Sequence, residues 1–395
     1  MLPRTINANQ MRWINRSAIL EFIRLNSPTS RTAIAKQLDV SMPTVMRIID
    51  DLFEEDLVLE AGQAQRGMGR KRRLIAYNKE AYSVIGIDLG GTKLYGALSN
   101  IGGDLLHEVT VQHHETTGEE SFVLVVDMIE ALLEHVPPGQ TMRGIAVGAP
   151  GITRNRAGVV EWAPSLNWRD FPLQERLKEH FHLPVLVDND VNLAVLGEHW
   201  FGAGKDVQNM ALISIGTGVG AGLILEGALY RGHSKASGEV GYMAPDIHAL
   251  GKSYESFGAL ESIISGTGIG ERAAHYLQGH DEAPPSTAPT AEEVFAAARA
   301  GEAWADEIVQ ETIDYLALGI ANINTLLDLE LVVLSGGVAQ QADLLIEGVY
   351  QRIAGVIPRA PNIVASTLGR SATVMGAIVL VVHATDNYYV VRKLS

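Results

Sequence analysis

A glycine-rich segment early in the chain combines residue types that hold phosphate. Residues 85–93 read Ile-Gly-Ile-Asp-Leu-Gly-Gly-Thr-Lys, between strand-like apolar runs. Gly90 and Gly91 would provide positive φ angles or a close approach of backbone to ligand. Backbone N–H groups, the Thr92 hydroxyl and the Lys93 charge suit a phosphate, and Asp88 could hold a metal-bound water beside it. The alternative is an ordinary β-hairpin with a Gly-Gly turn.

A second glycine-rich turn repeats this pattern. An apolar run over 210–215 leads into Gly216, Thr217 and Gly218, and a second strand is expected over 223–226. A strand rather than a helix follows the glycines, which excludes a Rossmann dinucleotide fingerprint. Two Gly-Thr turns in one chain predict two lobes that hold a polyphosphate between them. A further strand over 331–334 ends in Ser-Gly-Gly, where Gly336 and Gly337 suit a platform for a nucleotide base.

Polar side chains follow another buried strand, predicted over 184–187. Asp188, Asn189 and Asp190 come directly after it, at the end of the strand where open α/β sheets bind their ligands. Asp190 is suited to act as a general base on a hydroxyl, and the Asn189 amide could bind a neighbouring hydroxyl. The alternative is structural, and we expect either Asp188 or Asp190 to cap a helix that begins near Val191.

Length and composition set the framework for these motifs. The chain has 395 residues, a net charge of −15, 47% hydrophobic residues and no cysteine. This length predicts two or three domains, and the missing cysteines exclude disulfides and thiolate metal sites. A signal segment and an apolar run of about 18 residues are both lacking, so the expected compartment is the cytoplasm, with no membrane partner. Alternating strands and helices after residue 84 predict α/β architecture.

The first 80 residues differ in charge from the rest. They hold 13 Lys and Arg against 9 Asp and Glu, a net of +4, which leaves −19 for the remainder. Apolar periodicity predicts helices over 10–25, 31–38 and 41–53, followed by strands over 57–60 and 74–77. Ser41 would cap the third helix, with a proline in its first turn. This order is typical of a winged helix-turn-helix, and the alternative is a small dimerisation domain with a basic loop.

The winged helix predicts a set of DNA contacts. The third helix would enter the major groove, and the Gly- and Arg-rich tip of the hairpin would reach phosphates or a minor groove. The expected contact residues are Ser41, Met42, Thr44, Arg47, Arg70, Lys71, Arg72 and Arg73.

In combination, these motifs resemble the ROK family of repressors, open reading frames and sugar kinases. Residues 88–92 look like its first phosphate motif, 216–220 like the second, 335–337 like the adenosine motif and 188–190 like the sugar and catalytic-base motif. The resemblance implies an actin-like (RNase H-like) domain with two α/β lobes around a sugar cleft. The expected boundaries are a winged helix over 1–78, a first lobe over 84–190 that the helix 376–395 could complete, and a second lobe over 191–375.

The resemblance also implies ligands for the cleft. Its sugar residues would be Asn189, Asp190, Glu239, Tyr242 and Glu261, with ATP and Mg²⁺ needed only if the chain is a kinase. The family's structural zinc is held by one histidine and three cysteines. The matching positions here are Tyr242, Lys252, Tyr254 and Ala259. All four ligands have changed together, so no zinc is expected.

Three functions are weighed. The first is a sugar-responsive repressor that binds operator DNA as a homodimer or tetramer, with a sugar changing the spacing of the recognition helices. The second is an ATP-dependent sugar kinase, or a bifunctional kinase and regulator, that also carries the DNA-binding head. It would use Asp190 as base, since the residues needed for phosphoryl transfer are present. The third is a DNA-binding scaffold without a small ligand. Polar residues that converge on a cleft argue against the scaffold.

Overall fold

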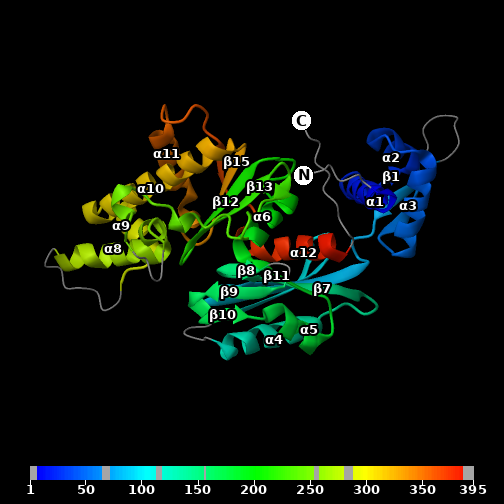
Figure 1. Ribbon diagram of the computed structural model, residues 1–395, viewed down its shortest axis with the longest axis horizontal. Coiled ribbons are helices and arrows are strands. Elements are labelled where there is room, and N and C mark those ends of the chain that lie inside the picture. Colours follow the sequence, from blue (N-terminus) through cyan, green and yellow to red (C-terminus); the bar gives the residue numbers. More distant parts are fainter. Residues whose placement is uncertain are drawn as a thin grey trace.

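The computed structural model describes residues 7–64, 72–112, 118–154, 157–252, 258–279 and 288–385. Figure 1 shows a small helical head beside two α/β lobes, with helix α12 (Ala372–Thr385) lying between the lobes. The expected C-terminal helix therefore begins at Ala372, and residues 386–395 lie outside the described part of the chain.

The head is a winged helix. Its N-terminal helix is followed by a helix-turn-helix pair, and its sheet has the strand order β1-β3-β2. Ser41 caps α3 as expected, because its Oγ accepts a hydrogen bond from the Thr44 N–H at 3.4 Å. The wing tip, with Arg70 and Lys71, lies outside the described residues. The elements are α1 (Ala8–Leu25), β1 (Thr29–Ser30), α2 (Arg31–Leu38), α3 (Met42–Glu54), β2 (Val58–Ala64) and β3 (Arg72–Tyr77).

The first lobe is built on a five-stranded sheet of order β11-β7-β4-β5-β6. Strands β4, β7 and β11 run parallel, while β5 and β6 are antiparallel. Figure 1 shows α4 and α5 below this sheet, and their apolar residues share a core with the sheet's lower face. The elements are β4 (Tyr82–Leu89), β5 (Lys93–Asn100), β6 (Leu105–Gln112), α4 (Glu119–Leu133), β7 (Thr141–Ala149), α5 (Leu173–Phe181) and β11 (Val185–Asn189).

The second lobe repeats this design. Its sheet has the order β14-β13-β12-β15-β16, with β12, β15 and β16 parallel and β13 and β14 antiparallel. This is the arrangement of the first sheet, element for element, so the duplication indicated by the two Gly-Thr turns is real. The strands are β12 (Met210–Ile215), β13 (Val219–Leu225), β14 (Ala228–Leu229), β15 (Leu331–Ser335) and β16 (Asn362–Ala365).

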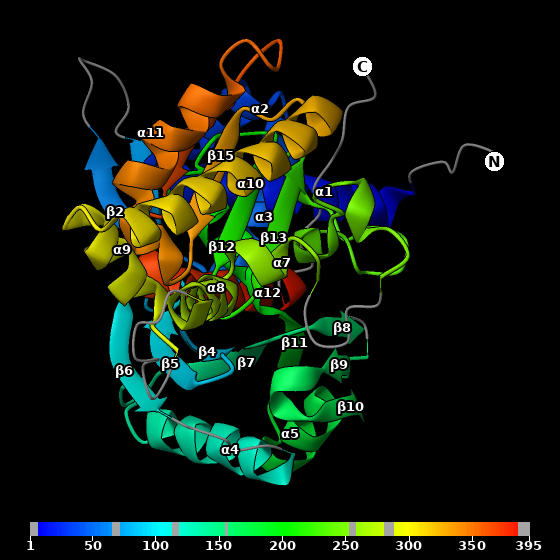
Figure 2. The ribbon, with the colours of Figure 1, turned by 90° about the vertical axis from the view of Figure 1, so that its left-hand side faces the viewer.

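Helices cover both faces of the second sheet. Figures 1 and 2 show α10 and α11 on one face, and α6 lies on the other. The prediction that β13 starts at residue 223 was wrong, because Gly220 and Gly222 belong to the strand. A Cβ at Gly222 would lie 2.5 Å from Val195 of α6, so these glycines permit close packing of the helix. The helices are α6 (Asp190–Phe201), α7 (Glu261–Ile264), α8 (Gly266–Gly279), α9 (Ala291–Arg299), α10 (Ala303–Leu327) and α11 (Ala342–Ile353).

The lobes meet through a close crossing of two helices. Helix α12 packs on β4 and β7 of the first sheet, α6 packs on β12 and β13 of the second, and the two helices pack on each other. Gly376 makes this contact possible, because a Cβ there would lie 1.7 Å from the Leu193 carbonyl oxygen. The core around this crossing is continuous with the core of the head. The head is therefore packed against the lobes rather than tethered to them.

Several elements of the structure were not expected from the sequence. One is a small antiparallel sheet of order β10-β9-β8 beside the first lobe, and the others are α8 and β16. The strands of the small sheet are β8 (Ile152–Arg154), β9 (Val159–Ala163) and β10 (Trp168–Phe171). Five short 3₁₀ segments complete the described chain: Pro164–Leu166, Val240–Tyr242, Ile247–Ala249, Val338–Gln341 and Gly369–Ser371. None of the helices in the described ranges has the length and hydropathy needed to cross a bilayer.

Candidate ligand cleft between the lobes

A cavity of about 1190 Å³ lies between the lobes. Both Gly-Thr hairpins, the turn after β15, the start of α6 and the start of α12 contribute to its walls. The arrangement brings together motifs that lie far apart in the sequence. Of the sequence-predicted residues, the lining includes Asp88, Gly90, Gly91, Thr92, Lys93, Asp190, Gly216, Thr217, Gly336 and Gly337.

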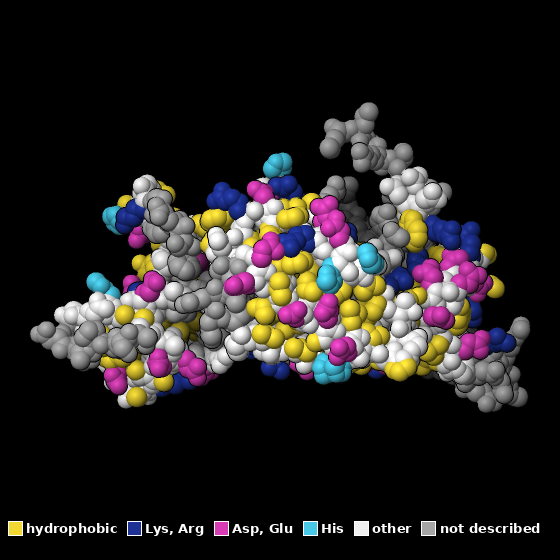
Figure 3. Space-filling view, turned by 90° about the horizontal axis from the view of Figure 1, so that it is seen from below, with side chains coloured by type: hydrophobic (Ala, Val, Ile, Leu, Met, Phe, Trp, Pro, Cys, Tyr) yellow, Lys and Arg dark blue, Asp and Glu magenta, His cyan; other side chains and the backbone are white. Residues whose placement is uncertain are grey.

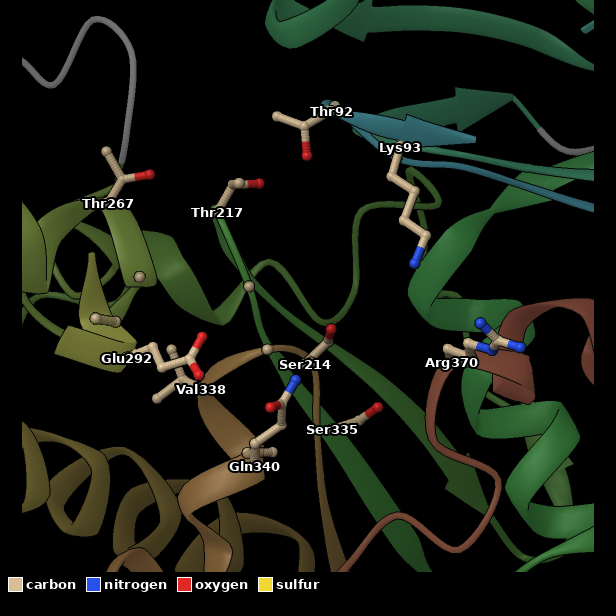
Figure 4. Close-up of a pocket in the computed structure, with 18 of the residues that line it drawn as sticks. Thr92, Lys93, Ser214, Thr217, Thr267, Glu292, Ser335, Val338, Gln340 and Arg370 are labelled. Carbon is tan, nitrogen blue, oxygen red and sulfur yellow. The ribbon is translucent and has the colours of Figure 1, made fainter. Parts of the chain in front are cut away.

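The first hairpin uses close approach rather than unusual backbone angles. Neither Gly90 nor Gly91 has a positive φ angle. Of the two expected reasons for these glycines, only the close approach of the backbone to other groups therefore applies. The Gly90 N–H donates to the Lys93 carbonyl oxygen at 3.0 Å, and a Cβ at Gly90 would lie 2.9 Å from that same oxygen. The hairpin can therefore close tightly and leave Thr92 and Lys93 facing the cavity (Figure 4).

The second hairpin and the β15 turn form the opposite wall. The Gly216 N–H donates to the Gly218 carbonyl oxygen at 2.9 Å, and Thr217 points into the cavity (Figure 4). Gly336 has a φ of +89°, and a Cβ there would lie 2.4 Å from the Ile215 carbonyl oxygen. Only glycine fits this position, because both its backbone angle and the approach of β12 exclude a side chain.

The three polar residues after β11 have different roles from those expected. Asn189, not Asp188 or Asp190, caps α6: its Oδ1 accepts from the Asn192 N–H and its Nδ2 donates to the Gly151 carbonyl oxygen, both at 3.0 Å. The expected cap was wrong because Asp188 is turned to an ion pair with Arg231 and Asp190 is already the first helical residue. Asn189 thereby positions Asp190 beside the cavity.

The two aspartates that line the cavity have strongly shifted pKa values. Enclosure by the cleft walls and the charge of Asp190 raise the pKa of Asp88 to about 8, against a hydrogen bond from Thr373 and the charge of Lys93. Enclosure also raises the pKa of Asp190 to about 7, and the charge of Glu239 adds to this, although the Val191 N–H opposes it. A carboxyl with a pKa near neutrality can exchange a proton with a sugar hydroxyl.

Glu239, Tyr242 and Glu261, which were also expected to bind sugar, are not part of the cavity lining but lie close to it, and the Glu239 charge acts on Asp190. Burial and the charge of Glu261 raise the pKa of Glu239, and burial raises the pKa of Glu261, whose Oε2 accepts from the Val219 N–H at 2.9 Å. A Cβ at Gly218 would lie 3.3 Å from the same Glu261 oxygen. Tyr242 is 56% exposed. Asp190, Glu239 and Glu261 thus form an acidic group between the second hairpin and the start of α6.

The raised pKa of Asp190 predicts a pH-dependent gain in stability when its charge is removed. Because the folded-state pKa lies above the unfolded value of 3.8, the contribution of this carboxyl is complete below about pH 4 and is lost as the pH rises through 7. Asp190→Asn should therefore raise the free energy of unfolding by about 2–4 kcal/mol at pH 8 and by less than about half as much at pH 5. Urea denaturation at both pH values measures this difference.

The control is Asp306→Asn, which changes an exposed aspartate of α10. It should have the same small effect at both pH values. An equal change for Asp190→Asn at pH 5 and pH 8 would contradict the raised pKa.

Several cavity residues were not predicted from the sequence. Figure 4 shows two of them, Ser214 and Gln340, beside Ser335 of the expected adenosine motif. Glu292 lies further along the cavity, and Arg370 lies on the side toward which Lys93 points. Arg370 follows a Leu-Gly pair that carried no recognisable motif. Lys93 and Arg370 place two positive charges on this side of the cleft, and the Arg370 guanidinium also pairs with Glu108 at 3.4 Å.

A zinc ion does not fit the matching residues of this chain. Tyr242, Lys252 and Ala259 offer no thiolate or imidazole, and Tyr254 lies outside the described residues. Over the described ranges, no group of three or more His, Asp or Glu side chains is arranged to hold a metal ion.

The head presents a second candidate surface, formed by α3. Arg47 is exposed, and in the described part of the chain it has no ion pair. Met46, 48% exposed beside it, was not predicted as a contact residue. Ser41 and Thr44 hydrogen-bond each other at 2.9 Å. Figure 3 shows basic and acidic side chains mixed over the head.

Ion pairs explain this mixture of charges. Arg12 pairs with Asp51 at 2.7 Å, Arg16 with Glu55 at 2.8 Å and Arg73 with Glu60 at 3.1 Å. Most arginines in the described part of the head are thus paired with acidic residues of the head itself. Within that part of the chain, Arg47 of α3 has no such partner. Arg72 belongs to β3, and its side chain is not described.

Residues 84–384 match the ROK family. The chain belongs to the ROK family. Over its whole length it is similar to the xylose repressor of Caldicellulosiruptor bescii, with 31% identity over 95% of this chain and 97% of the repressor. It is also similar to the glucokinase of Halalkalibacterium halodurans, with 34% identity over 74% of this chain and 92% of that enzyme.

A solved structure gives the same result for the fold. A ROK family transcriptional regulator, described as a homologue of the E. coli MLC protein, superposes with a TM-score of 0.82 and 25% identity over 96% of this chain and 98% of its own. The predicted fold class, a winged helix followed by an actin-like two-lobed ROK domain, is confirmed. The glucokinase similarity covers the ROK domain's share of the chain, whereas the repressor similarity also includes the head.

Proposed function

We infer that this protein is a sugar-responsive transcriptional repressor of the ROK family. The main support for this function is that a winged helix and a ROK domain occur in one chain and share a continuous hydrophobic core. The xylose repressor matches 95% of the chain, whereas the glucokinase matches 74% of it, about the share that the ROK domain occupies.

For the cleft, we propose a sugar as the effector. Asp190, Glu239 and Glu261 supply carboxyl groups that can accept hydrogen bonds from several hydroxyls of one ring, and Tyr242 adds a phenol at the exposed edge. The xylose repressors among the relatives make D-xylose the first sugar to test. The boundaries 1–78, 84–190 and 191–375 for head and lobes stay part of this proposal.

For the head, we propose that α3 enters a major groove and that the protein binds an inverted repeat as a homodimer. Ser41 and Thr44 bond each other at the start of α3, where they can turn to phosphates, while Met46 and Arg47 face outward. A two-fold operator requires two heads at a fixed spacing. Movement of the lobes would change that spacing and so release or secure the DNA.

The experiment is a footprint of the purified protein on the DNA upstream of its own gene, with and without each aldose of a panel that begins with D-xylose. The proposal expects a protected inverted repeat whose protection one sugar abolishes or strengthens. No protected repeat, or protection that every sugar leaves unchanged, would contradict it.

Arg47 is expected to contribute directly to operator binding. Arg47→Ala should weaken operator affinity by about 10- to 100-fold, because an arginine contact to DNA contributes about 1–3 kcal/mol. Fluorescence anisotropy with a labelled operator measures this loss. Binding to variant operators and a salt titration identify the contact: loss of a base contact reduces sequence specificity, whereas loss of a phosphate contact lowers the salt slope by about one. The matched control is Arg359→Ala, an exposed arginine far from the head, which should leave affinity unchanged.

A kinase activity is the second candidate, and the position of Asp190 favours it. Its pKa of about 7 suits a base that accepts a hydroxyl proton, and both Gly-Thr hairpins face the same cavity. If ATP and Mg²⁺ bind, Thr92, Lys93 and Thr217 are placed to hold the phosphates, and the metal would neutralise their charge. A coupled assay of ADP release over the same aldoses, with Asp190→Asn as control, tests it, and no turnover on any sugar would exclude it.

A further inference from the structure

Two contacts connect the head to different lobes of the ROK domain, and a further hydrogen bond runs from the Tyr77 hydroxyl of β3 to the Ile101 carbonyl oxygen beside the first sheet at 3.4 Å. Trp200 lies in the last turn of α6, which packs on the second sheet, and the Arg24 guanidinium of α1 lies 4.2 Å from the centre of the Trp200 ring. On the other side, Tyr82 begins β4 of the first sheet, and its hydroxyl donates to the Glu55 carbonyl oxygen at 2.9 Å. Glu55 is the C-cap of α3, the helix that would read DNA.

Both contacts are tied to α12. The Trp200 ring meets the His383 ring edge-on, with centroids 4.7 Å apart. The Arg143 guanidinium lies 4.5 Å from the centre of the Tyr82 ring, and its Nε donates to Thr385 Oγ1 at 3.0 Å. The last turn of α12 therefore contacts Trp200, the partner of α1, directly, and is linked to Tyr82, the partner of α3, through Arg143.

The other ends of the same two helices lie at the cleft. Asp190 and Thr373, near the starts of α6 and α12, line the cavity, and Thr373 hydrogen-bonds Asp88. With a rise of 1.5 Å per residue, α6 spans about 18 Å and α12 about 21 Å. Each helix is a rigid element that reaches from the ligand cavity to the head.

A buried carboxylate also fixes the cavity loop to α6. Glu198 is fully buried and accepts four hydrogen bonds, from the Ala203 and Leu368 N–H groups and from the hydroxyls of Ser366 and Thr367, at 2.6–3.0 Å. Ser366 lines the cavity. Glu198 lies two residues before Trp200, so the loop and the head contact are linked through one turn of helix.

We propose that Trp200 and Tyr82 are the positioning residues through which the head senses the relative position of the two lobes. Closure of the cleft moves α6 against α12, since these helices form the contact between the lobes. The head is bound to one lobe at Trp200 and to the other at Tyr82, so it cannot keep both contacts unchanged. The proposal rests on the proposed regulator function only in naming a sugar as the natural cause of closure.

The test closes the cleft without any sugar. The chain has no cysteine, so Thr92→Cys/Thr217→Cys places two unique thiols on the opposing hairpins (Figure 4). A short bis-maleimide then joins the lobes, and the crosslinked full-length protein is isolated by intact mass. Hydrogen–deuterium exchange of α1 and of the last turn of α3 is measured with and without the crosslink. Operator affinity is measured in parallel.

Crosslinking should change exchange in these segments by about fivefold or more, within the usual range of coupling between sites. Trp200→Leu combined with Tyr82→Phe should reduce this response to less than about twofold, while uncrosslinked operator affinity stays within about threefold of wild type. Trp200→Phe, which keeps a ring beneath Arg24, should retain most of the response. The matched controls are Trp304→Leu and Tyr315→Phe, both on α10, which should retain it fully.

An unchanged head on crosslinking, or a full response in the double variant, would overturn the proposal. Failure of the regulator function has a different signature: the crosslink response persists, but no operator is bound or no sugar reproduces the effect of the crosslink.

Discussion

Arg231→Met should destabilise the protein by about 3–5 kcal/mol, because it removes the arginine that is ion-paired with a buried carboxylate. Asp188 is 1% exposed and ends β11 of the first sheet, whereas Arg231 follows β14 of the second. The pair therefore joins the two lobes next to Asn189 and Asp190. We expect the free energy of unfolding from urea denaturation to fall by this amount, together with a loss of sugar binding.

Two controls separate charge from side-chain volume. Adding Asp188→Asn to Arg231→Met removes the remaining charge of the pair, while the new amide oxygen can still accept from the Asn189 N–H, so most of the stability should return. Arg299→Met breaks an exposed pair with Asp343 and should cost less than about 1 kcal/mol. A loss that is equal in the single and double variants would mean that the ion pair is not the cause.

Gly376→Ala should destabilise the protein by more than about 3 kcal/mol, because the added methyl group has no room. Its Cβ would lie 1.7 Å from the Leu193 carbonyl oxygen, and the opposing Gly197 has a Cβ position 2.2 Å from the Ala372 carbonyl oxygen. Both obstacles are backbone atoms, so relief requires α6 and α12 to separate. The variant should unfold at lower urea concentration, and its surviving folded fraction should lose the sugar response of operator binding.

Gly279→Ala is the matched control, since this glycine ends α8 with nothing within 4 Å of its Cβ position. Alanine there should be neutral or slightly stabilising. If Gly376→Ala were as mild as Gly279→Ala, the close crossing of the two helices would not be a structural requirement.

These expectations share one physical feature. The ligand cleft, the contact between the lobes and the support of the head all involve α6 and α12. Substitutions that change how these helices meet should therefore affect stability and regulation together, whereas Trp200 and Tyr82, at the far end, should affect regulation with little cost in stability.

The sequence by itself determined the elements that depend on local chemistry. Ser41 and the apolar spacing that follows it define α3, because a cap and a helical stripe act within a few residues. Both Gly-Thr turns and the strands beside them were readable for the same reason, and their likeness correctly indicated duplicated lobes. The family followed from these motifs in order.

Only the tertiary structure decided what each polar residue and glycine does. Asp188 and Arg231 are 43 positions apart, so no local pattern could assign them to each other, and the cap of α6 passed to Asn189 as a result. Gly222 and Gly376 are explained by helices that approach them from distant parts of the chain. The apolar residues of α12 show no helical periodicity, because the helix is buried on nearly all sides. The sequence therefore does not indicate which elements the helix packs against. Its place between the lobes and against the head is set by long-range packing, which a sequence pattern does not encode.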